Sequence, residues 1–202
     1  STLRFLVPIT LVRKGGARFT GRGRLGQRPM EPYFRIFERQ GISFSQSPGP
    51  ELDLTVKGEL QPGEFFLPGD VSSQFISGLL FALPLLKGNS TIHITTPLES
   101  KAYINMTIKV MRDFGVEVFS DGGSTFKVEG RQRYQSRDYL IEGDYSQAAF
   151  FLAAGALGAE VEVTGLQADS LQGDKEILNI IRKMGGQIRQ GDEGLAARPG
   201  ED

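Results

Sequence analysis

An internal repeat constrains the fold of this chain more than any other feature of its sequence. GDVSSQFISGLLFAL begins at Gly69 and GDYSQAAFFLAAGAL begins at Gly143, so each copy runs from Gly-Asp through a hydroxyl residue into an apolar helix. An alternating strand follows each helix, at 91–95 and at 161–164. Because repeated units bury their apolar faces against one another, the pattern predicts a fold assembled from copies of one unit.

The start of the chain shows the same order of elements. Residues 1–9 read as an apolar helix led by a hydroxyl residue, 17–20 as a strand, and 29–40 as an amphipathic helix with proline in its first turn. Glycine just past a helix end is a common stop signal. Such a glycine follows the second helix of all three copies: Gly41, Gly115 and Gly185.

These copies predict an α/β (α+β) fold of repeated βαβαββ units, with the first strand of copy one missing. The stretches 52–67 and 125–141 are expected to supply the closing strands of copies one and two. Copy three is expected to lack its closing strands.

The composition excludes several classes of site. The chain has 202 residues, a net charge of −1, no cysteine and a single histidine, His93. The lack of cysteine removes disulfides, thiolate nucleophiles and cysteine-zinc sites, and the near-neutral charge does not fit a chain built to bind nucleic acid or an anionic membrane. The apolar run at 75–86 is too short to span a bilayer. We expect a cytoplasmic protein with neither nucleic acid nor a membrane as partner.

The turn before the helix of copy two has the side chains of an anion site. Turns from strand to helix collect ligands in α/β proteins, because free N–H groups and the positive end of the helix dipole favour anions there. A single serine is an ordinary helix cap. Ser72, Ser73 and Gln74 together offer more hydrogen-bonding groups than a cap needs, and we predict that they bind phosphate or carboxylate.

A second kind of turn contains GRGRLGQR at 21–28, whose glycines have the G-x-G-x-x-G spacing of a dinucleotide-binding loop. The corresponding turns of the other copies are not rich in glycine, and no acidic residue lies about twenty positions further on to bind a ribose. We therefore favour an anion site at Arg28, whose planar guanidinium suits carboxylate or phosphate. RNA binding through the basic residues 13–28 stays an alternative, although Phe19 is the only aromatic residue there.

The matching turn of copy two contains Ser100 and Tyr103, which could bond a polar substrate. Tyr103 is equally an ordinary aromatic residue at a helix start. His93 lies between isoleucines, and we expect it to be an ordinary strand residue.

Four stretches carry a resemblance to a known family: GDVSSQFISGLLFALPLL, LESKAYINMTIKVMRDFGVEV, IEGDYSQAAFFLAAGAL and LGQRPMEPYF. In this chain they resemble the 5-enolpyruvylshikimate-3-phosphate synthases, in order and over essentially the whole length. The Ser-Ser-Gln and Arg-Pro motifs are specific only in combination. The resemblance implies two domains, each built from three βαβαββ units about a pseudo-threefold axis, and an incomplete two-domain chain that is an internal fragment. Residues 1–142 would be two units of the first domain, which binds shikimate 3-phosphate, and 143–202 would begin the second domain with one partial unit.

The resemblance also implies an activity. The enolpyruvyl group of phosphoenolpyruvate would pass to the 5-hydroxyl of shikimate 3-phosphate with release of phosphate, by addition and then elimination, in the shikimate pathway to aromatic amino acids. No metal and no organic cofactor would be needed. We expect a monomer in the full-length form and no activity of this fragment alone. The UDP-N-acetylglucosamine enolpyruvyl transferases share fold and donor and stay an alternative, although most members have a cysteine before the Arg-Pro motif.

Residue roles follow from the same resemblance. No catalytic residue is assigned within the chain, because the family's proton-transfer groups would lie outside it. The residues that would bind shikimate 3-phosphate are Ser72, Ser73, Gln74, Ser100 and Tyr103. The residues that would bind phosphoenolpyruvate are Arg28, Gln74, Ser1 and Arg4, with Gln74 between the two substrates.

Overall fold

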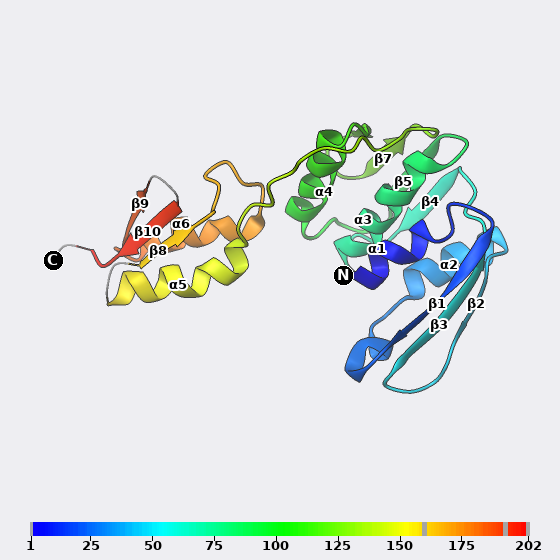
Figure 1. The fold of residues 1–202 in the computed structure, drawn as a ribbon, viewed down its shortest axis with the longest axis horizontal. Helices are drawn as coiled ribbons and strands as arrows, with labels where there is room; N and C mark the ends of the chain where they lie inside the picture. Colours follow the sequence, from blue (N-terminus) through cyan, green and yellow to red (C-terminus); the bar gives the residue numbers. More distant parts are fainter. Residues whose placement is uncertain (1, 159–160, 192–193, 201–202) are drawn as a thin grey trace. The chain divides into compact units, whose positions relative to one another are not determined.

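A computed structural model of the chain describes residues 2–158, 161–191 and 194–200. The chain forms two compact bodies, Ser1–Ser136 and Arg137–Asp202 (Figure 1). The first body contains repeats one and two, and the second contains repeat three. Each body has a separate hydrophobic core.

Repeat one contains two helices and one antiparallel sheet of three strands. The sheet has the order β1-β3-β2, so the last strand of the repeat lies between the other two. Its elements are α1 (Thr2–Ile9), β1 (Gly15–Gly21), α2 (Glu31–Gln40), β2 (Ser43–Gln46) and β3 (Leu52–Gly58), with a short 3₁₀ helix at Gly23–Gln27 between β1 and α2.

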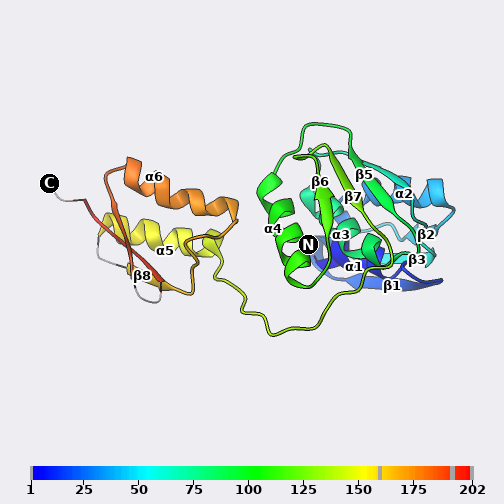
Figure 2. The ribbon, with the colours of Figure 1, turned by 90° about the horizontal axis from the view of Figure 1, so that it is seen from above.

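Repeat two is a complete βαβαββ unit. Its first two strands are parallel and joined by a helix, and the sheet has the order β4-β5-β7-β6. Figure 2 labels β5, β7 and β6 side by side. The elements are β4 (Glu64–Leu67), α3 (Ser73–Ala82), β5 (Ser90–Ile94), α4 (Lys101–Asp113), β6 (Val118–Ser120) and β7 (Thr125–Val128), with a 3₁₀ turn at Leu83–Leu85 after α3.

Repeat three has the same topology as repeat one. Its antiparallel sheet has the order β8-β10-β9, which again puts the last strand in the centre. Its elements are α5 (Tyr145–Leu157), β8 (Val161–Thr164), α6 (Ile177–Lys183), β9 (Gln187–Gln190) and β10 (Gly194–Arg198), with a 3₁₀ turn at Gly173–Glu176 before α6.

Three predictions about closing strands were wrong. Residues 64–67 do not close repeat one, because β4 pairs with β5 and begins repeat two. Only Thr125–Val128 of the stretch 125–141 forms a strand, and the chain from 129 to 144 has no regular element. Repeat three does have a closing strand, β10. Its first four residues, Gly-Leu-Ala-Ala, are apolar and buried, so the strand lacks the alternation that signals a strand with one exposed face.

Helices α1 and α3 pack side by side at the centre of the first body (Figure 1). Their close approach depends on Gly78 of α3. A Cβ atom at this position would lie 2.2 Å from the Tyr33 hydroxyl oxygen and 2.3 Å from the Arg4 carbonyl oxygen. Helix α3 is largely buried. Among the described residues no helix is long and apolar enough to cross a membrane.

Replacing Gly78 with alanine should therefore destabilise the first body. Alanine in the middle of a helix is normally favourable by about 1 kcal/mol, but here we expect a loss of about 2 kcal/mol because the new methyl group overlaps two oxygen atoms. Urea unfolding of the chain measures the change. Gly15→Ala is the matched control, since the nearest atom to its new methyl group, the Arg13 carbonyl oxygen, would be 3.8 Å away. Its free energy of unfolding should change by less than about 1 kcal/mol. A stabilised Gly78→Ala protein would contradict the packing described.

Candidate functional site

The two strand-to-helix turns of repeat two are bonded to each other. The Gly69 N–H donates to the Thr96 hydroxyl at 2.9 Å, and that hydroxyl donates to the Asp70 carboxylate at 2.7 Å. The Glu99 N–H donates to the Gly69 carbonyl at 3.1 Å. Because β4 and β5 are parallel, their carboxyl ends meet at one sheet edge, and these bonds join the turn before α3 to the turn before α4.

The amino end of α3 presents hydroxyl groups beside free helix N–H groups. Ser72 caps the helix by accepting a hydrogen bond from the Gln74 N–H at 3.3 Å. The half-buried Ser73 hydroxyl has no hydrogen-bond partner among the described residues. The first N–H groups of a helix have no partners within the helix, and the positive end of its dipole favours an anion. This end of α3 can therefore accept a phosphate or carboxylate group.

Arg4 of α1 connects this end of α3 to the turn before α2. Its guanidinium donates to the Ser72 hydroxyl at 3.3 Å, to the Gln74 amide oxygen at 3.1 Å and to the Pro29 carbonyl at 2.9 Å. It also lies 4.4 Å from the centre of the Phe75 ring, a favourable cation–π distance. One side chain thus joins the two turns that the sequence singled out as anion sites.

The positive charge of Arg4 is buried without a bonded carboxylate. The residue is only 8% exposed, and the hydrogen-bond partners of its guanidinium in the described part of the chain are all uncharged. Burial, followed by the neighbouring charge of Arg28, lowers the pKa of Arg4, although an arginine stays protonated. Because a buried charge is costly unless it is paired, this arrangement favours the binding of an anion.

Arg28 is exposed, and its guanidinium has no hydrogen-bond or ion-pair partner among the described residues. Its charge acts on Arg4, so both guanidinium groups contribute to one positive region. The preceding glycines have structural roles. A Cβ atom at Gly26 would lie 2.2 Å from the Glu51 carbonyl oxygen, and the Gly26 N–H donates to the Pro50 carbonyl at 3.1 Å. That N–H is unavailable for a pyrophosphate, which agrees with rejecting the dinucleotide interpretation.

Ser100 has a conformation that the sequence did not reveal. Its φ and ψ are 55° and 37°, in the left-handed region that glycine prefers, and its hydroxyl makes no capping bond to α4. Such a backbone costs free energy, and a hydroxyl not used for capping is available to a ligand. Tyr103 follows one turn later and is 43% exposed. Ser1, the remaining predicted residue, lies outside the described residues.

The basic stretch at 13–28 is less open than its sequence implied. Arg18 forms a two-point ion pair with Asp53, at 2.8 and 3.0 Å. Phe19, its one aromatic residue, packs against the hydrophobic core. Because Phe19 is partly buried, the stretch offers little aromatic surface for the base stacking that single-stranded RNA binding uses.

His93 lies on β5, where it pairs with Glu64 and stacks on Phe66 with ring centres 5.0 Å apart.

The amino end of α5 differs from that of α3, although their sequences are similar. Asp144 caps α5, and its carboxylate accepts hydrogen bonds from the N–H groups of Ser146 and Gln147 and from the Ser146 hydroxyl. These bonds lower the pKa of Asp144. A negative cap occupies the place where an anion would bind, so the neutral cap of α3 is the better anion site of the two.

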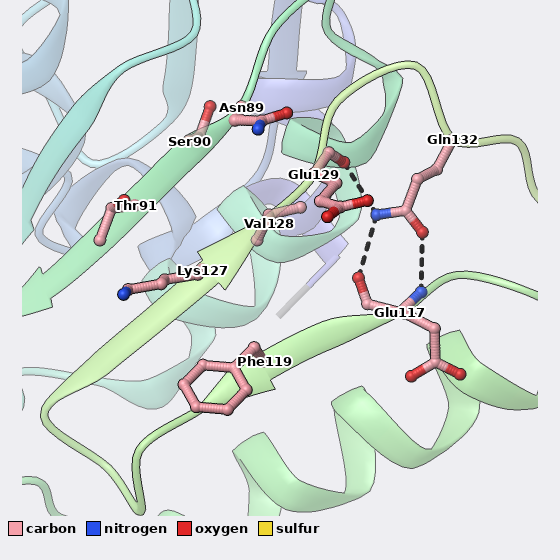
Figure 3. A pocket seen from close by; sticks show the side chains of 9 residues that line it. All are labelled: Asn89, Ser90, Thr91, Glu117, Phe119, Lys127, Val128, Glu129 and Gln132. Carbon is pink, nitrogen blue, oxygen red and sulfur yellow. Dashed lines mark hydrogen bonds between the residues drawn. The ribbon is translucent and has the colours of Figure 1, made fainter.

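A hollow on repeat two lies apart from these residues (Figure 3). Gln132 crosses one side of it, donating to the carbonyls of Glu117 at 3.0 Å and Glu129 at 2.8 Å and accepting from the Glu117 N–H at 2.8 Å. These bonds fasten the chain after β7 to the start of β6. The other lining residues include Phe119 and Lys127 but none of the predicted site residues.

The family model and the curated relatives that match this chain carry the same enzyme name. The family model described as EPSP synthase (3-phosphoshikimate 1-carboxyvinyltransferase) matches residues 1–201. A 3-phosphoshikimate 1-carboxyvinyltransferase of Clostridium botulinum (strain Eklund 17B / Type B) is 54% identical over 195 residues, which are 96% of this chain and 45% of that protein. One of Clostridioides difficile (strain 630) is 50% identical over 96% of this chain and 44% of that protein. The chain thus spans less than half the length of these relatives.

Solved structures support the fold. An EPSP synthase of Acinetobacter baumannii superposes with a TM-score of 0.73 at 21% identity, over 99% of this chain and 46% of that one. The enolpyruvyl transferase NikO of Streptomyces tendae superposes with a TM-score of 0.69 at 21% identity, over 97% of this chain and 46% of that one.

The strained backbone of Ser100 leads to a prediction with two readouts. Ser100→Gly should raise the free energy of unfolding by about 1 kcal/mol because it relieves the left-handed conformation, whereas Ser100→Ala should leave it within about 0.5 kcal/mol. Both variants lose the hydroxyl, so both should bind inorganic phosphate more weakly by the same factor. Urea unfolding and NMR titration measure the two effects. Unchanged phosphate binding in both variants would show that the hydroxyl has no part in the site.

Proposed function

The chain belongs to the EPSP synthase family, and we propose that it carries the substrate-binding groups of an enzyme that transfers an enolpyruvyl group. The donor would be phosphoenolpyruvate, the acceptor the 5-hydroxyl of shikimate 3-phosphate, and phosphate the second product. The proposal rests mainly on one observation. The described part of the site is a positive region in which Arg4 has no bonded carboxylate and the Arg28 guanidinium has no hydrogen-bond or ion-pair partner.

The amino end of α3 is the proposed site for the phosphate of shikimate 3-phosphate. Ser72 and Ser73 offer hydroxyl groups, and the helix N–H groups offer further donors to an anion. Gln74 and the turn that holds Ser100 adjoin the same sheet edge, with Tyr103 one turn further along α4. Two anionic substrates need many donors and few acceptors, which is the chemistry found here.

Arg28 is the proposed ligand for phosphoenolpyruvate. Its guanidinium can bind a carboxylate or a phosphate in two-point geometry, and no protein group competes for it within the described residues. Arg4 adds charge to the same region. Ser1 stays a predicted phosphoenolpyruvate contact that lies outside the described residues. Gln74, held between Arg4 and the end of α3, would lie between the two substrates.

The reaction would proceed by addition of the acceptor hydroxyl to the enolpyruvyl group and elimination of phosphate from the tetrahedral intermediate. The residues described here bind and orient anions, but they include no assigned proton donor or acceptor for these steps. Charge that develops in a transition state is stabilised by donors arranged on all sides of it. We therefore propose that this chain alone binds substrate weakly and does not catalyse turnover.

The alternatives have weaker support. A UDP-N-acetylglucosamine enolpyruvyl transferase would share the fold, but the family model and the curated relatives carry the name of the shikimate enzyme. An RNA-binding module would need aromatic rings beside its basic residues, but Phe19 packs against the core and Arg18 is paired with Asp53.

Binding of shikimate 3-phosphate to the 202-residue chain tests this proposal. Wild type should bind with millimolar affinity, and Ser73→Ala or Gln74→Ala should weaken binding about tenfold, because each removes a hydrogen bond to a charged group. Ser45→Ala, on the exposed part of β2, is the control and should bind like wild type. NMR titration gives the affinities. The chain should release no phosphate from phosphoenolpyruvate in the presence of shikimate 3-phosphate.

Two results would contradict the proposal. One is wild-type binding that Ser73→Ala and Gln74→Ala leave unchanged. The other is preferential binding of single-stranded RNA with an affinity that falls steeply as salt rises. Measurable phosphate release would overturn the claim that the chain alone cannot turn over.

A further inference from the structure

We propose that Arg4 is a positioning residue that makes Ser72 and Gln74 hydrogen-bond donors toward the ligand. This inference rests on the proposed function, because it names how the same site selects its substrates. Arg4 is 8% exposed and bonds to both side chains as well as to the Pro29 carbonyl. Its own donors are therefore directed at protein atoms.

The orientation of the Gln74 amide follows from the chemistry of arginine. A guanidinium has N–H donors and no acceptor, so the Gln74 atom 3.1 Å from Arg4 must be the amide oxygen. The NH₂ group of Gln74 then points away from Arg4. It has no hydrogen-bond partner among the described residues and can donate to a ligand.

The same reasoning applies to the Ser72 hydroxyl. Its oxygen accepts one bond from Arg4 at 3.3 Å and another from the Gln74 N–H at 3.3 Å. Two accepted bonds use both lone pairs of a hydroxyl oxygen. Its own proton is left to be donated, so Ser72 also faces the ligand as a donor.

This arrangement gives the site a preference for ligand groups that only accept hydrogen bonds. Phosphate and carboxylate oxygens are such groups, whereas an alcohol that must donate finds the Ser72 and Gln74 oxygens already used. Arg4 also ties the turn carrying Arg28, through Pro29, to the end of α3, so it holds the two anion-binding groups at a constant separation. Its contribution to binding would act through its neighbours and not through contact with the substrate.

A ligand-free measurement tests the orientation directly. In wild type, the Gln74 side-chain amide should give a nitrogen resonance that differs from those of exposed glutamines, because its oxygen is bonded to a guanidinium. Arg4→Met should move that resonance to the value of exposed glutamines, and Arg4→Lys should restore part of the difference. A variant that lost only packing would leave the resonance in place. An unchanged Gln74 resonance in the folded Arg4→Met and Arg4→Lys proteins would overturn the inference.

Titration with shikimate 3-phosphate then separates positioning from direct contact. Arg4→Met and Gln74→Met should each weaken binding about tenfold, as expected for losing a hydrogen bond to a charged group, and the double variant should lose no more than about threefold beyond either one. Arg112→Met on α4 is the control, since Arg112 pairs with Glu117 away from the site. If the loss of affinity in the double variant is the product of the two single losses, Arg4 contacts the substrate itself. That result would overturn the inference.

The two proposals fail in different ways. If wild type does not respond to shikimate 3-phosphate but the Gln74 resonance still depends on Arg4, the proposed substrate is wrong and the positioning role stands. If wild type binds shikimate 3-phosphate and both Arg4→Lys and Arg4→Met bind it as tightly as wild type does, the proposed function stands and the positioning role is wrong. Arg4→Lys keeps the test valid if Arg4→Met does not fold.

Discussion

The close contact between α1 and α3 is the constraint on which the rest of the site depends. Gly78 of α3 has no side chain, so the backbone of α1 can come close to it. The Tyr33 hydroxyl of α2 bridges the two helices, 2.7 Å from the Arg4 carbonyl of α1 and 3.0 Å from the Phe75 carbonyl of α3. This approach brings the Arg4 guanidinium to the amino end of α3. Arg4 is the side chain that bonds to both the turn before α2 and the turn before α3, so the link between these turns depends on that approach.

Charge and hydrogen-bond direction then define what the site can bind. The two arginines, the helix end and the serine hydroxyls together offer donors and positive charge, while the described residues bond no carboxylate to Arg4. The homologous end of α5 has the opposite character because Asp144 caps it. Similar sequences, GDVSSQ and GDYSQ, thus produce two helix ends of different charge, depending on which residue accepts from the first N–H groups.

Much of this could be predicted from the sequence, because the repeat and the helix periodicity are strong signals. The order of helices and strands in the three copies follows from local pattern, and the same pattern is the basis of the prediction that Ser72 and Arg28 bind anions. What could not be predicted depends on contacts between distant residues. The pairing of β4 with β5, the central position of β10 and the bonds of Arg4 are long-range, and the left-handed backbone of Ser100 has no signature in a serine. The glycine of α3 was a visible signal, but its partners Tyr33 and Arg4 were not.

A crystal structure of the chain with shikimate 3-phosphate would test the central claim most directly. We expect the phosphate at the amino end of α3, bonded by Ser72, Ser73 and the NH₂ group of Gln74, with Arg4 still bonded to the Gln74 oxygen. A phosphate bound in the hollow beside Gln132, at the basic residues 13–24, or directly on an Arg4 guanidinium detached from Gln74 would contradict it.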